Sequence, residues 1–170
     1  MQDEIVEVVD KDCTILRRVE KQVAHKEGLL HKTVIATIIN SAGKRMLVRP
    51  YSHRQDAGQF VSPVGGHVTA GETDDEALKR EVMEEVGLEG FKYKLKGKGI
   101  FDRWVLGRHE NHYFILYEVF TDQKPVLGDE AKSLKWFTDE ELKYELKKHP
   151  KDFGDAFYFV YKSFYPELLS

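Results

Sequence analysis

Two segments of the chain are rich in apolar and β-branched residues and stand out as buried strands. TVIATIIN (33–40) is almost uninterrupted, and HYFILYEVF (112–120) is the second such run. Runs of this length, bounded by polar turns, are typical of strands with both faces covered. A shorter run, RMLV (45–48), follows the first after the turn SAGK and predicts a hairpin. A sheet is therefore expected at the centre of the fold.

Shorter patterns predict the remaining strands and the loops between them. Apolar alternation or short apolar runs place further strands at 4–9, 13–18, 60–64, 91–101 and 134–137. Polar composition predicts loops at 51–59, 102–111 and 121–130. Gly97 and Gly99 indicate a bulge or bend in the fourth of these strands.

Four segments are expected to be helical. They cover 19–26, 73–87, 138–149 and 155–165. Thr73 and Thr138 are each followed three residues later by a glutamate, the pattern of a capping box. Gly87 stands where a helix ends in the left-handed conformation, and Pro150 stops the third helix. Interspersed strands and helices make the chain an α/β protein, and its 170 residues fit one domain.

Composition narrows the classes of function. The hydrophobic share of 41% is ordinary for a soluble globular protein, and a net charge of −3 predicts no general affinity for nucleic acid or membranes. No apolar run approaches the length of a membrane span, and the N-terminus MQDEIVEVVD lacks the apolar core of a signal peptide. The single cysteine, Cys13, excludes an intrachain disulfide. A cytoplasmic location is expected.

The helix at 73–87 carries an unusual group of carboxylates. Glu81, Glu84 and Glu85 stand at i, i+3 and i+4 and therefore share one face. Like charges at this spacing destabilise a helix by roughly 0.2–0.5 kcal/mol per pair. The face is therefore either simply solvated or bound to a hard cation, and Mg²⁺ suits a few carboxylates with water and substrate phosphates. Arg80 precedes the group and can hold a carboxylate in a bidentate geometry.

The same stretch, GHVTAGETDDEALKREVMEEVGL (66–88), resembles the Nudix box, G-x5-E-x7-R-E-U-x-E-E-x-G-U, in which U is aliphatic. The residues at its fixed positions are Gly66, Glu72, Arg80, Glu81, Val82, Glu84, Glu85, Gly87 and Leu88. The chain is thus identified as a member of the Nudix family by resemblance. That resemblance implies an α/β/α sandwich with a mixed central sheet and an N-terminal β-hairpin extension. It also implies Mg²⁺- or Mn²⁺-dependent hydrolysis of a nucleoside diphosphate linked to another moiety.

The resemblance also assigns roles to residues. It implies that Glu81, Glu84 and Glu85 bind the metal, helped by the carbonyl of Gly65. Arg80 would orient Glu81, and Glu72 would support the metal site from the loop. The general base stays open among Glu84, Glu85, Asp129 and Glu130. Residues 1–32 would form an N-terminal extension, 33–149 the Nudix core and 150–170 a C-terminal helix. A homodimer is expected by analogy with the family only.

The N-terminal half resembles the isopentenyl-diphosphate isomerases, which share the Nudix fold. The similar stretches are VEKQVAHKEGLLH (19–31), TVIATIINSAGKRMLVR (33–49) and GGH (65–67). That family holds a second metal with three histidines and two glutamates. The corresponding positions here are His25, His31, His67, Glu110 and His112, with histidine in place of the last glutamate. Such donors suit Zn²⁺, Mn²⁺ or Fe²⁺. The alternative is that these are ordinary histidines.

Isomerase chemistry is the less favoured function. The isomerases use a cysteine where this chain has Gly65, and a glutamate where it has His112. The intact box favours hydrolysis, and a non-catalytic ligand-sensing Nudix module is a third hypothesis. No residue is assigned to the substrate: four arginines are candidates for phosphates and two aromatic residues for a base. These are Arg49, Arg54, Arg103, Arg108, Trp104 and Tyr113.

Overall fold

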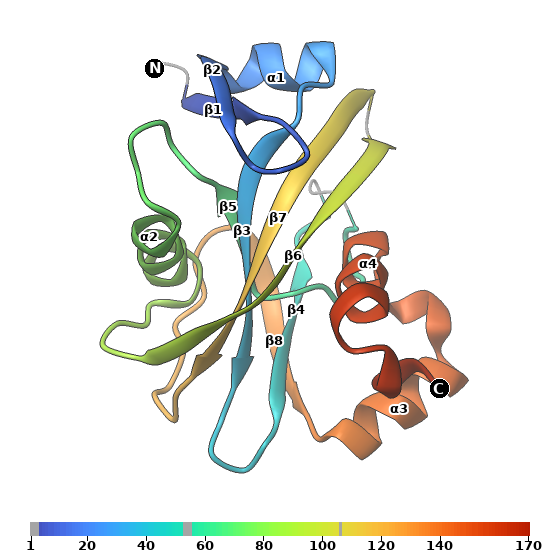
Figure 1. Cartoon of the computed structure of the whole chain (residues 1–170). Coiled ribbons are helices and arrows are strands. Elements are labelled where there is room, and N and C mark those ends of the chain that lie inside the picture. The colour runs from blue at the N-terminus through green and yellow to red at the C-terminus, as the bar shows by residue number, and fades with distance from the viewer. Residues whose placement is uncertain (1–3, 53–55, 106) are drawn as a thin grey trace.

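The computed structural model describes residues 4–52, 56–105 and 107–170 (Figure 1). The strands are β1 (Ile5–Val9), β2 (Ile15–Glu20), β3 (His31–Ile39), β4 (Arg45–Pro50), β5 (Val64–His67), β6 (Lys92–Val105), β7 (Arg108–Phe120) and β8 (Ala131–Phe137). The α-helices are α1 (Lys21–Glu27), α2 (Asp74–Val86), α3 (Asp139–Lys148) and α4 (Asp155–Phe164), with short 3₁₀ helices at Pro150–Asp152 and Pro166–Leu169.

The central sheet contains all eight strands of the described residues. Its main path is β2-β1-β3-β4-β8, while β5 and β7 also pair with β3, and β6 pairs with β7. The β3–β7 pair is parallel and the other pairs are antiparallel, so the sheet is mixed. Helix α2 covers one face of the sheet, and α3 and α4 cover the other (Figure 1). The expected α/β/α arrangement and the N-terminal hairpin β1–β2 are thereby confirmed.

Strand β3 is buried on both faces, which accounts for its uninterrupted apolar sequence. Val34, Ala36 and Ile38 pack in one apolar cluster with residues of α2. Ile35, on the other face, packs in a second cluster with residues of α3 and α4 such as Leu142. Side chains alternate between the faces of a strand, so two cores meet at β3.

Helix α2 begins and ends where its sequence predicts. The Thr73 hydroxyl accepts a hydrogen bond from the Glu76 backbone N–H at 3.1 Å. Gly87 ends the helix with φ of 64°, a conformation that costs glycine little. Leu78, Val82 and Val86 are fully buried, which fixes the rotation of the helix and directs its glutamates toward β5.

The predicted loop at 102–111 is wrong. Strand β6 extends to Val105 and β7 begins at Arg108, so most of this segment is a long hairpin. The polar residues that indicated a loop face each other as cross-strand pairs, among them Arg103 with Glu110 and Trp104 with His109. Opposite charges on facing strands stabilise such a pair, which polarity alone does not reveal.

Smaller differences concern strand boundaries. The strand predicted at 60–64 lies instead at Val64–His67, preceded by isolated bridges at Phe60 and Val61. β2 and β8 are displaced or longer than expected. The bulge expected near Gly97 is present as a shift in register after Leu95. Within the described ranges, helices are too short or too polar to cross a membrane.

Candidate functional site

Strand β5 carries the sequence VGGH and brings two groups of side chains together. It pairs antiparallel with β3, with Gly66 opposite Val34 and His67 opposite Thr33. Successive residues of a strand face opposite sides of the sheet. Gly66 therefore faces α2, and the His67 side chain faces the side on which further histidines lie.

Gly66 makes room for Glu81. A Cβ atom added at Gly66 would overlap the carboxylate of Glu81, whose side chain is buried against the strand. At Gly65 the nearest atoms to such a Cβ lie 4.0 Å away, so only one of the two glycines is required by space. The box therefore requires glycine at position 66 because Glu81 occupies the volume that a side chain there would fill.

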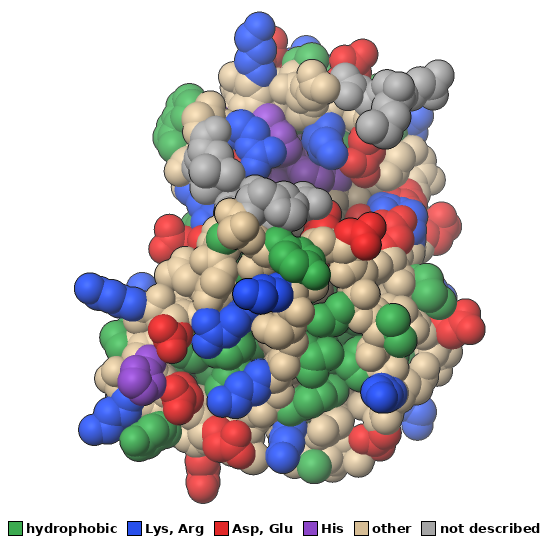
Figure 2. Space-filling view, turned by 180° about the vertical axis from the view of Figure 1, so that it is seen from behind, with side chains coloured by type: hydrophobic (Ala, Val, Ile, Leu, Met, Phe, Trp, Pro, Cys, Tyr) green, Lys and Arg blue, Asp and Glu red, His purple; other side chains and the backbone are tan. Residues whose placement is uncertain are grey.

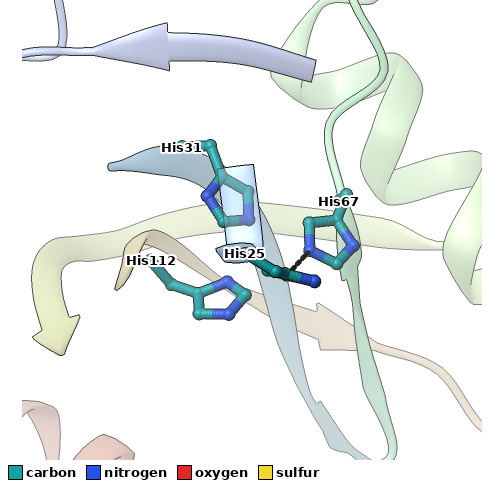
Figure 3. Close-up of side chains that lie close together, drawn as sticks. All are labelled: His25, His31, His67 and His112. Atoms are coloured by element: carbon teal, nitrogen blue, oxygen red, sulfur yellow. Dashed lines mark hydrogen bonds between the residues drawn. The ribbon is translucent and has the colours of Figure 1, made fainter. Parts of the chain in front are cut away.

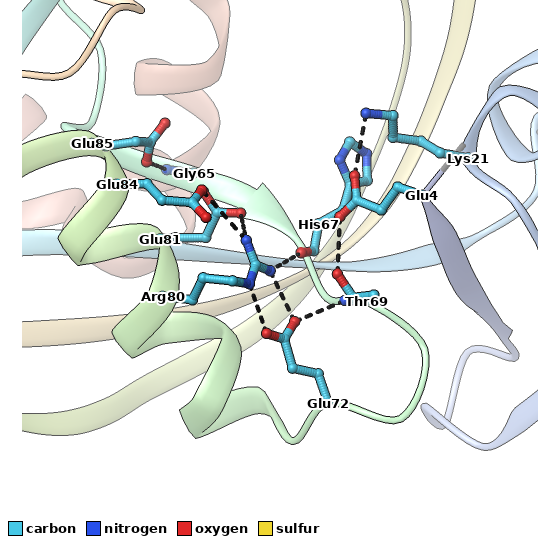
Figure 4. Close-up of polar contacts among 10 residues, drawn as sticks. All are labelled: Glu4, Lys21, Gly65, His67, Thr69, Glu72, Arg80, Glu81, Glu84 and Glu85. Carbon is cyan, nitrogen blue, oxygen red and sulfur yellow. Dashed lines mark hydrogen bonds and ion pairs between the residues drawn. The ribbon is translucent and has the colours of Figure 1, made fainter. Parts of the chain in front are cut away.

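Arg80 holds the acidic group in place through four hydrogen bonds (Figure 4). Its guanidinium donates to both oxygens of Glu72, at 2.7 and 2.8 Å, in a bidentate pair. It also donates to Glu81 Oε1 at 2.7 Å and to the His67 carbonyl at 3.1 Å. Both Glu72 oxygens face Arg80, and Oε1 also accepts from the Thr69 N–H. Glu72 therefore supports the carboxylate group through Arg80.

Glu85 lies at the other end of the carboxylate group. Its Oε2 accepts from the Gly65 N–H at 2.9 Å, and its backbone carbonyl accepts from the Gly128 N–H at 2.9 Å. The second contact ties the loop after β7 to α2, and Asp129 and Glu130 of that loop line one cleft together with Glu81, Glu84 and Glu85. The pKa of Glu85 is raised to about 9, mainly by burial. The nearby Glu81 and Glu130 contribute to this rise, and the hydrogen bond from the Gly65 N–H opposes it.

Burial likewise raises the pKa of Glu81 to about 7, although its hydrogen bond and charge contact with Arg80 oppose the shift. Glu84 is exposed to solvent, with Oε2 at 3.5 Å from the Arg80 guanidinium. Carboxylates that hold protons because they crowd and desolvate one another release them to a divalent cation. The carboxylate oxygens of Glu81, Glu84 and Glu85 are the type of ligand that Mg²⁺ or Mn²⁺ prefers.

Four histidines form the second group, and the fold explains their meeting (Figure 3). His25 comes from α1, His31 from β3, His67 from β5 and His112 from β7. His31 and His112 are register partners in the parallel β3–β7 pair. One nitrogen from each ring lies within 4.8 Å of the others, and His67 is the least buried of the four.

Glu110 lies beside this group but faces other partners. Its Oε1 is 3.0 Å from Arg108, and its Oε2 is 3.6 Å from Arg103 and 3.7 Å from His112 Nε2. The contacts with His112, Arg103 and Arg108 lower its pKa against the effect of burial. The structure therefore brings all five expected residues together: the four histidines cluster, and Glu110 contacts both His112 and the two arginines.

The acidic group and three of the four histidines, His25, His67 and His112, line one cleft of about 1090 Å³. Figure 2 shows histidine side chains in a hollow between basic side chains. Of the candidate phosphate contacts, Arg103 and Arg108 line this cleft. Arg49 instead donates to the Gly58 carbonyl and stacks on Phe60, and Arg54 lies outside the described residues. Trp104 is 72% exposed and stacks on His109 at the hairpin tip.

Sequence reasoning missed Thr33. Its hydroxyl lies 2.5 Å from His112 Nδ1 and fixes the orientation of that ring. The sequence does contain one signal for Thr33: it stands two residues after His31 on the same strand, so the two side chains share a face. Its partner His112 is 79 residues away, and only the β3–β7 pairing relates the two.

Comparisons with known proteins agree with this fold. The family model for the NUDIX domain matches residues 29–157. An isopentenyl-diphosphate Delta-isomerase of Serratia proteamaculans is 28% identical over 163 residues, covering 94% of this chain and 90% of that protein. An uncharacterized Nudix hydrolase of Streptomyces coelicolor is 34% identical over 94 residues, 52% of this chain and 49% of that protein. The crystal structure of a Deinococcus radiodurans protein has a TM-score of 0.74 at 20% identity, covering 95% and 99% of the two chains.

Proposed function

The chain belongs to the Nudix family, and on that premise we propose that it is a divalent-metal-dependent pyrophosphohydrolase. Its substrate would be a nucleoside diphosphate linked to another moiety, cleaved by attack of water on phosphorus. One observation carries the proposal: Arg80, clamped by Glu72, holds the Glu81 carboxylate in the space left by Gly66. A solvated acidic helix face has no need of this buried and preorganised arrangement.

Mg²⁺ or Mn²⁺ would be held by Glu81, Glu84 and Glu85 with the carbonyl of Gly65. When bound, the ion supplies positive charge against the anionic diphosphate and acidifies a coordinated water. The protein supplies position. Arg80 fixes Glu81, and the Gly65 N–H fixes Glu85, so little reorganisation is needed when substrate binds.

A carboxylate lining the cleft would take the proton from the attacking water. Glu84, Glu85, Asp129 and Glu130 all line it. Catalysis in such a site depends mainly on positioning and electrostatic stabilisation of the phosphoryl group. With one cysteine in the chain, a reducing compartment is compatible, and the cytoplasm is the proposed location.

A relative that aligns over nearly the full chain is an isopentenyl-diphosphate Delta-isomerase, so isomerase-like chemistry is the second candidate. It is weaker because the thiol position of that family reads Gly65 and the second glutamate position reads His112. Space does not impose the glycine, since a Cβ at Gly65 would lie 4.0 Å from its nearest neighbours. The backbone at position 65 has room for a Cβ atom, so the absence of a cysteine there removes the thiol that isomerase chemistry uses without being imposed by the packing.

The test is product release from a panel of diphosphates, with Mg²⁺ or Mn²⁺. The panel contains nucleoside triphosphates, nucleotide sugars, ADP-ribose, NADH, CoA, dinucleoside polyphosphates and isopentenyl diphosphate. Wild type is compared with Glu84→Gln and Glu85→Gln, and Glu76→Gln serves as the control because that exposed residue lies on the same helix.

Hydrolysis that the first two substitutions abolish and the control retains is the expected result. Conversion of isopentenyl diphosphate without phosphate release would support the isomerase instead. Nucleotide binding without turnover at any divalent ion would support a ligand-sensing module.

A further inference from the structure

We propose that Gly128 is a positioning residue of the acidic site. Its backbone lies against the last turn of α2 and thereby sets the separation between Glu85 of the box and Glu130 of the loop that connects β7 to β8. The catalytic consequence rests on the function proposed above, whereas the consequence for metal binding can be measured without a substrate.

The loop before β8 runs along the end of α2 and binds its free carbonyl groups. The last carbonyls of a helix have no partner within the helix. Here the Gly128 N–H donates to the Glu85 carbonyl at 2.9 Å. The Val126 N–H donates to the Val86 carbonyl, also at 2.9 Å. The loop is thus bound to the same turn from which the Glu85 side chain reaches Gly65 (Figure 4).

Only glycine fits at position 128, because the two backbones touch there. A Cβ atom added at Gly128 would lie 2.4 Å from the backbone oxygen of Glu84 and 3.5 Å from the Cα atom of Glu85. A carbonyl oxygen within a helix cannot turn away as the end of a flexible side chain can. The φ angle of Gly128 lies outside the left-handed region, so its conformation does not itself require glycine. Space alone excludes a side chain at this position.

The box glycine Gly87 meets the same loop from the helix side. Besides ending α2 in the left-handed conformation, it would bring an added Cβ to 3.2 Å from both the Cβ atom and the backbone oxygen of Val126. Such contacts are tighter than those of ordinary side chains. One glycine in the helix end and one in the loop therefore allow the close approach of the two segments.

This approach determines where Glu130 lies. Besides burial, contact with the Glu130 carboxyl raises the pKa of Glu85, so the two side chains lie close together. The Glu130 backbone carbonyl accepts from the Tyr51 N–H at 3.3 Å, and β8 begins at the next residue. Only the two residues between Gly128 and β8 can therefore absorb a displacement of Gly128.

A side chain at position 128 would change the distance between the two carboxylates. Its Cβ atom would have to move from 2.4 Å to an ordinary contact distance of 3.4 Å from the Glu84 oxygen, a shift of 1.0 Å. A misplacement of about 1 Å in a catalytic site can cost about 10²-fold in rate. The negative charge of Glu130 beside Glu85 also attracts a divalent cation, and this attraction weakens as the distance grows.

The test is a double-mutant cycle in which calorimetric titration measures Mg²⁺ binding to the metal-stripped protein. Mg²⁺ is the probe because it prefers carboxylates to imidazoles. Gly128→Ala and Glu130→Gln should each weaken Mg²⁺ binding by about 10- to 100-fold, the range for groups that position metal ligands. The double variant should bind Mg²⁺ about as strongly as Glu130→Gln alone, because Gly128→Ala acts by displacing Glu130.

Gly43→Ala is the control for general destabilisation. Gly43 lies in the turn between β3 and β4, with a φ of 76° and no atom within 4 Å of an added Cβ. Alanine there strains the backbone and lowers stability, but Mg²⁺ binding should be unchanged.

Mg²⁺ binding that Gly128→Ala leaves unchanged, or losses that add up in the double variant, would overturn the proposal. Glu130→Gln keeps the shape of the side chain, so unchanged Mg²⁺ binding in this variant would overturn it even if Gly128→Ala does not fold.

Catalysis provides the second measurement. On the substrate that the panel identifies, at saturating Mg²⁺, Gly128→Ala should lower kcat by about 10²-fold with little change in KM. An unchanged kcat would overturn the positioning role. Absence of hydrolysis in wild type would refute the proposed function instead, and the Mg²⁺ cycle would still decide the role of Gly128.

Discussion

At the scale of single residues, neighbouring glycines have different roles. Gly66 lies against the Glu81 carboxylate, while Gly65 offers its N–H to Glu85 and would bring an added Cβ only to ordinary van der Waals contact, at 4.0 Å. The sequence identifies both positions by motif and by resemblance, and it also predicts Arg80 as a clamp. It does not show that the clamp closes mainly on Glu72, because that contact depends on how the loop before α2 folds back.

We predict that Gly66→Ala impairs the box far more than Gly65→Ala. The new methyl group would displace Glu81, and a misplacement of about 1 Å in a catalytic site can cost about 10²-fold in rate. Gly65→Ala meets no atom closer than 4.0 Å and keeps the backbone N–H and carbonyl. The measurement is kcat with Mg²⁺ on the substrate found by the panel, and equal losses in the two variants would contradict the role of Gly66.

At the scale of elements, helices were easier to predict than strand ends. Caps are local, so Thr73 and Gly87 could be read from neighbours in the sequence. The polarity of residues 102–111 predicts a loop, but in the hairpin β6–β7 these polar residues pair with one another across the two strands. The short strand β5 was placed a few residues early because its glycines carry no apolar pattern; only its pairing with β3 defines it.

The cap of α2 provides a test at this scale. Thr73→Ala removes the hydroxyl that accepts from Glu76 N–H and should lower the free energy of unfolding by about 1 kcal/mol. Thr138→Ala removes the equivalent bond in α3 and should cost a similar amount. Since α2 alone carries the box, only Thr73→Ala should also weaken Mg²⁺ binding, measured by calorimetric titration. An equal weakening in Thr138→Ala would show that general destabilisation is responsible.

At the scale of the whole molecule, two donor groups from distant parts of the chain share one cleft. The box could be found in the sequence because its members lie in one continuous stretch, residues 66–88. The four histidines were grouped only by resemblance, since their positions 25, 31, 67 and 112 have no regular spacing. The contacts of Glu110 with Arg103 and Arg108, beside its contact with His112, are known only once β6 and β7 are paired.

The stability of the whole protein should depend on pH through the carboxylates. The folded state raises the pKa of Glu85 to about 9 and that of Glu81 to about 7. At a pH between the ordinary pKa of 4.5 and these raised values, the folded protein keeps protons on the two carboxylates that the unfolded chain releases. Without metal, this contribution is fully present below about pH 4.5 and is lost as pH rises through about 9. His25 and His31, with pKa values lowered to about 4, act with the opposite sign, but only below about pH 6.5.

Melting temperatures between pH 7 and 9 would check this prediction, measured in EDTA and in saturating Mg²⁺. The melting temperature in EDTA should fall with pH, and the fall should be removed by Mg²⁺, which binds the deprotonated carboxylates. Glu85→Gln should flatten the profile in EDTA. Identical slopes in EDTA for wild type and Glu85→Gln would contradict the assignment.

The parallel pairing of β3 with β7 also has a consequence for synthesis on the ribosome. His31 and His112 are partners in that pairing, so β3 leaves the ribosome long before the strand that covers its edge. Until then the apolar, β-branched segment TVIATII has unpaired backbone groups along that edge. Non-local strand pairs form slowly, and exposed strands of this composition promote aggregation. Translation between these two strands is therefore the interval in which the nascent chain most needs a chaperone.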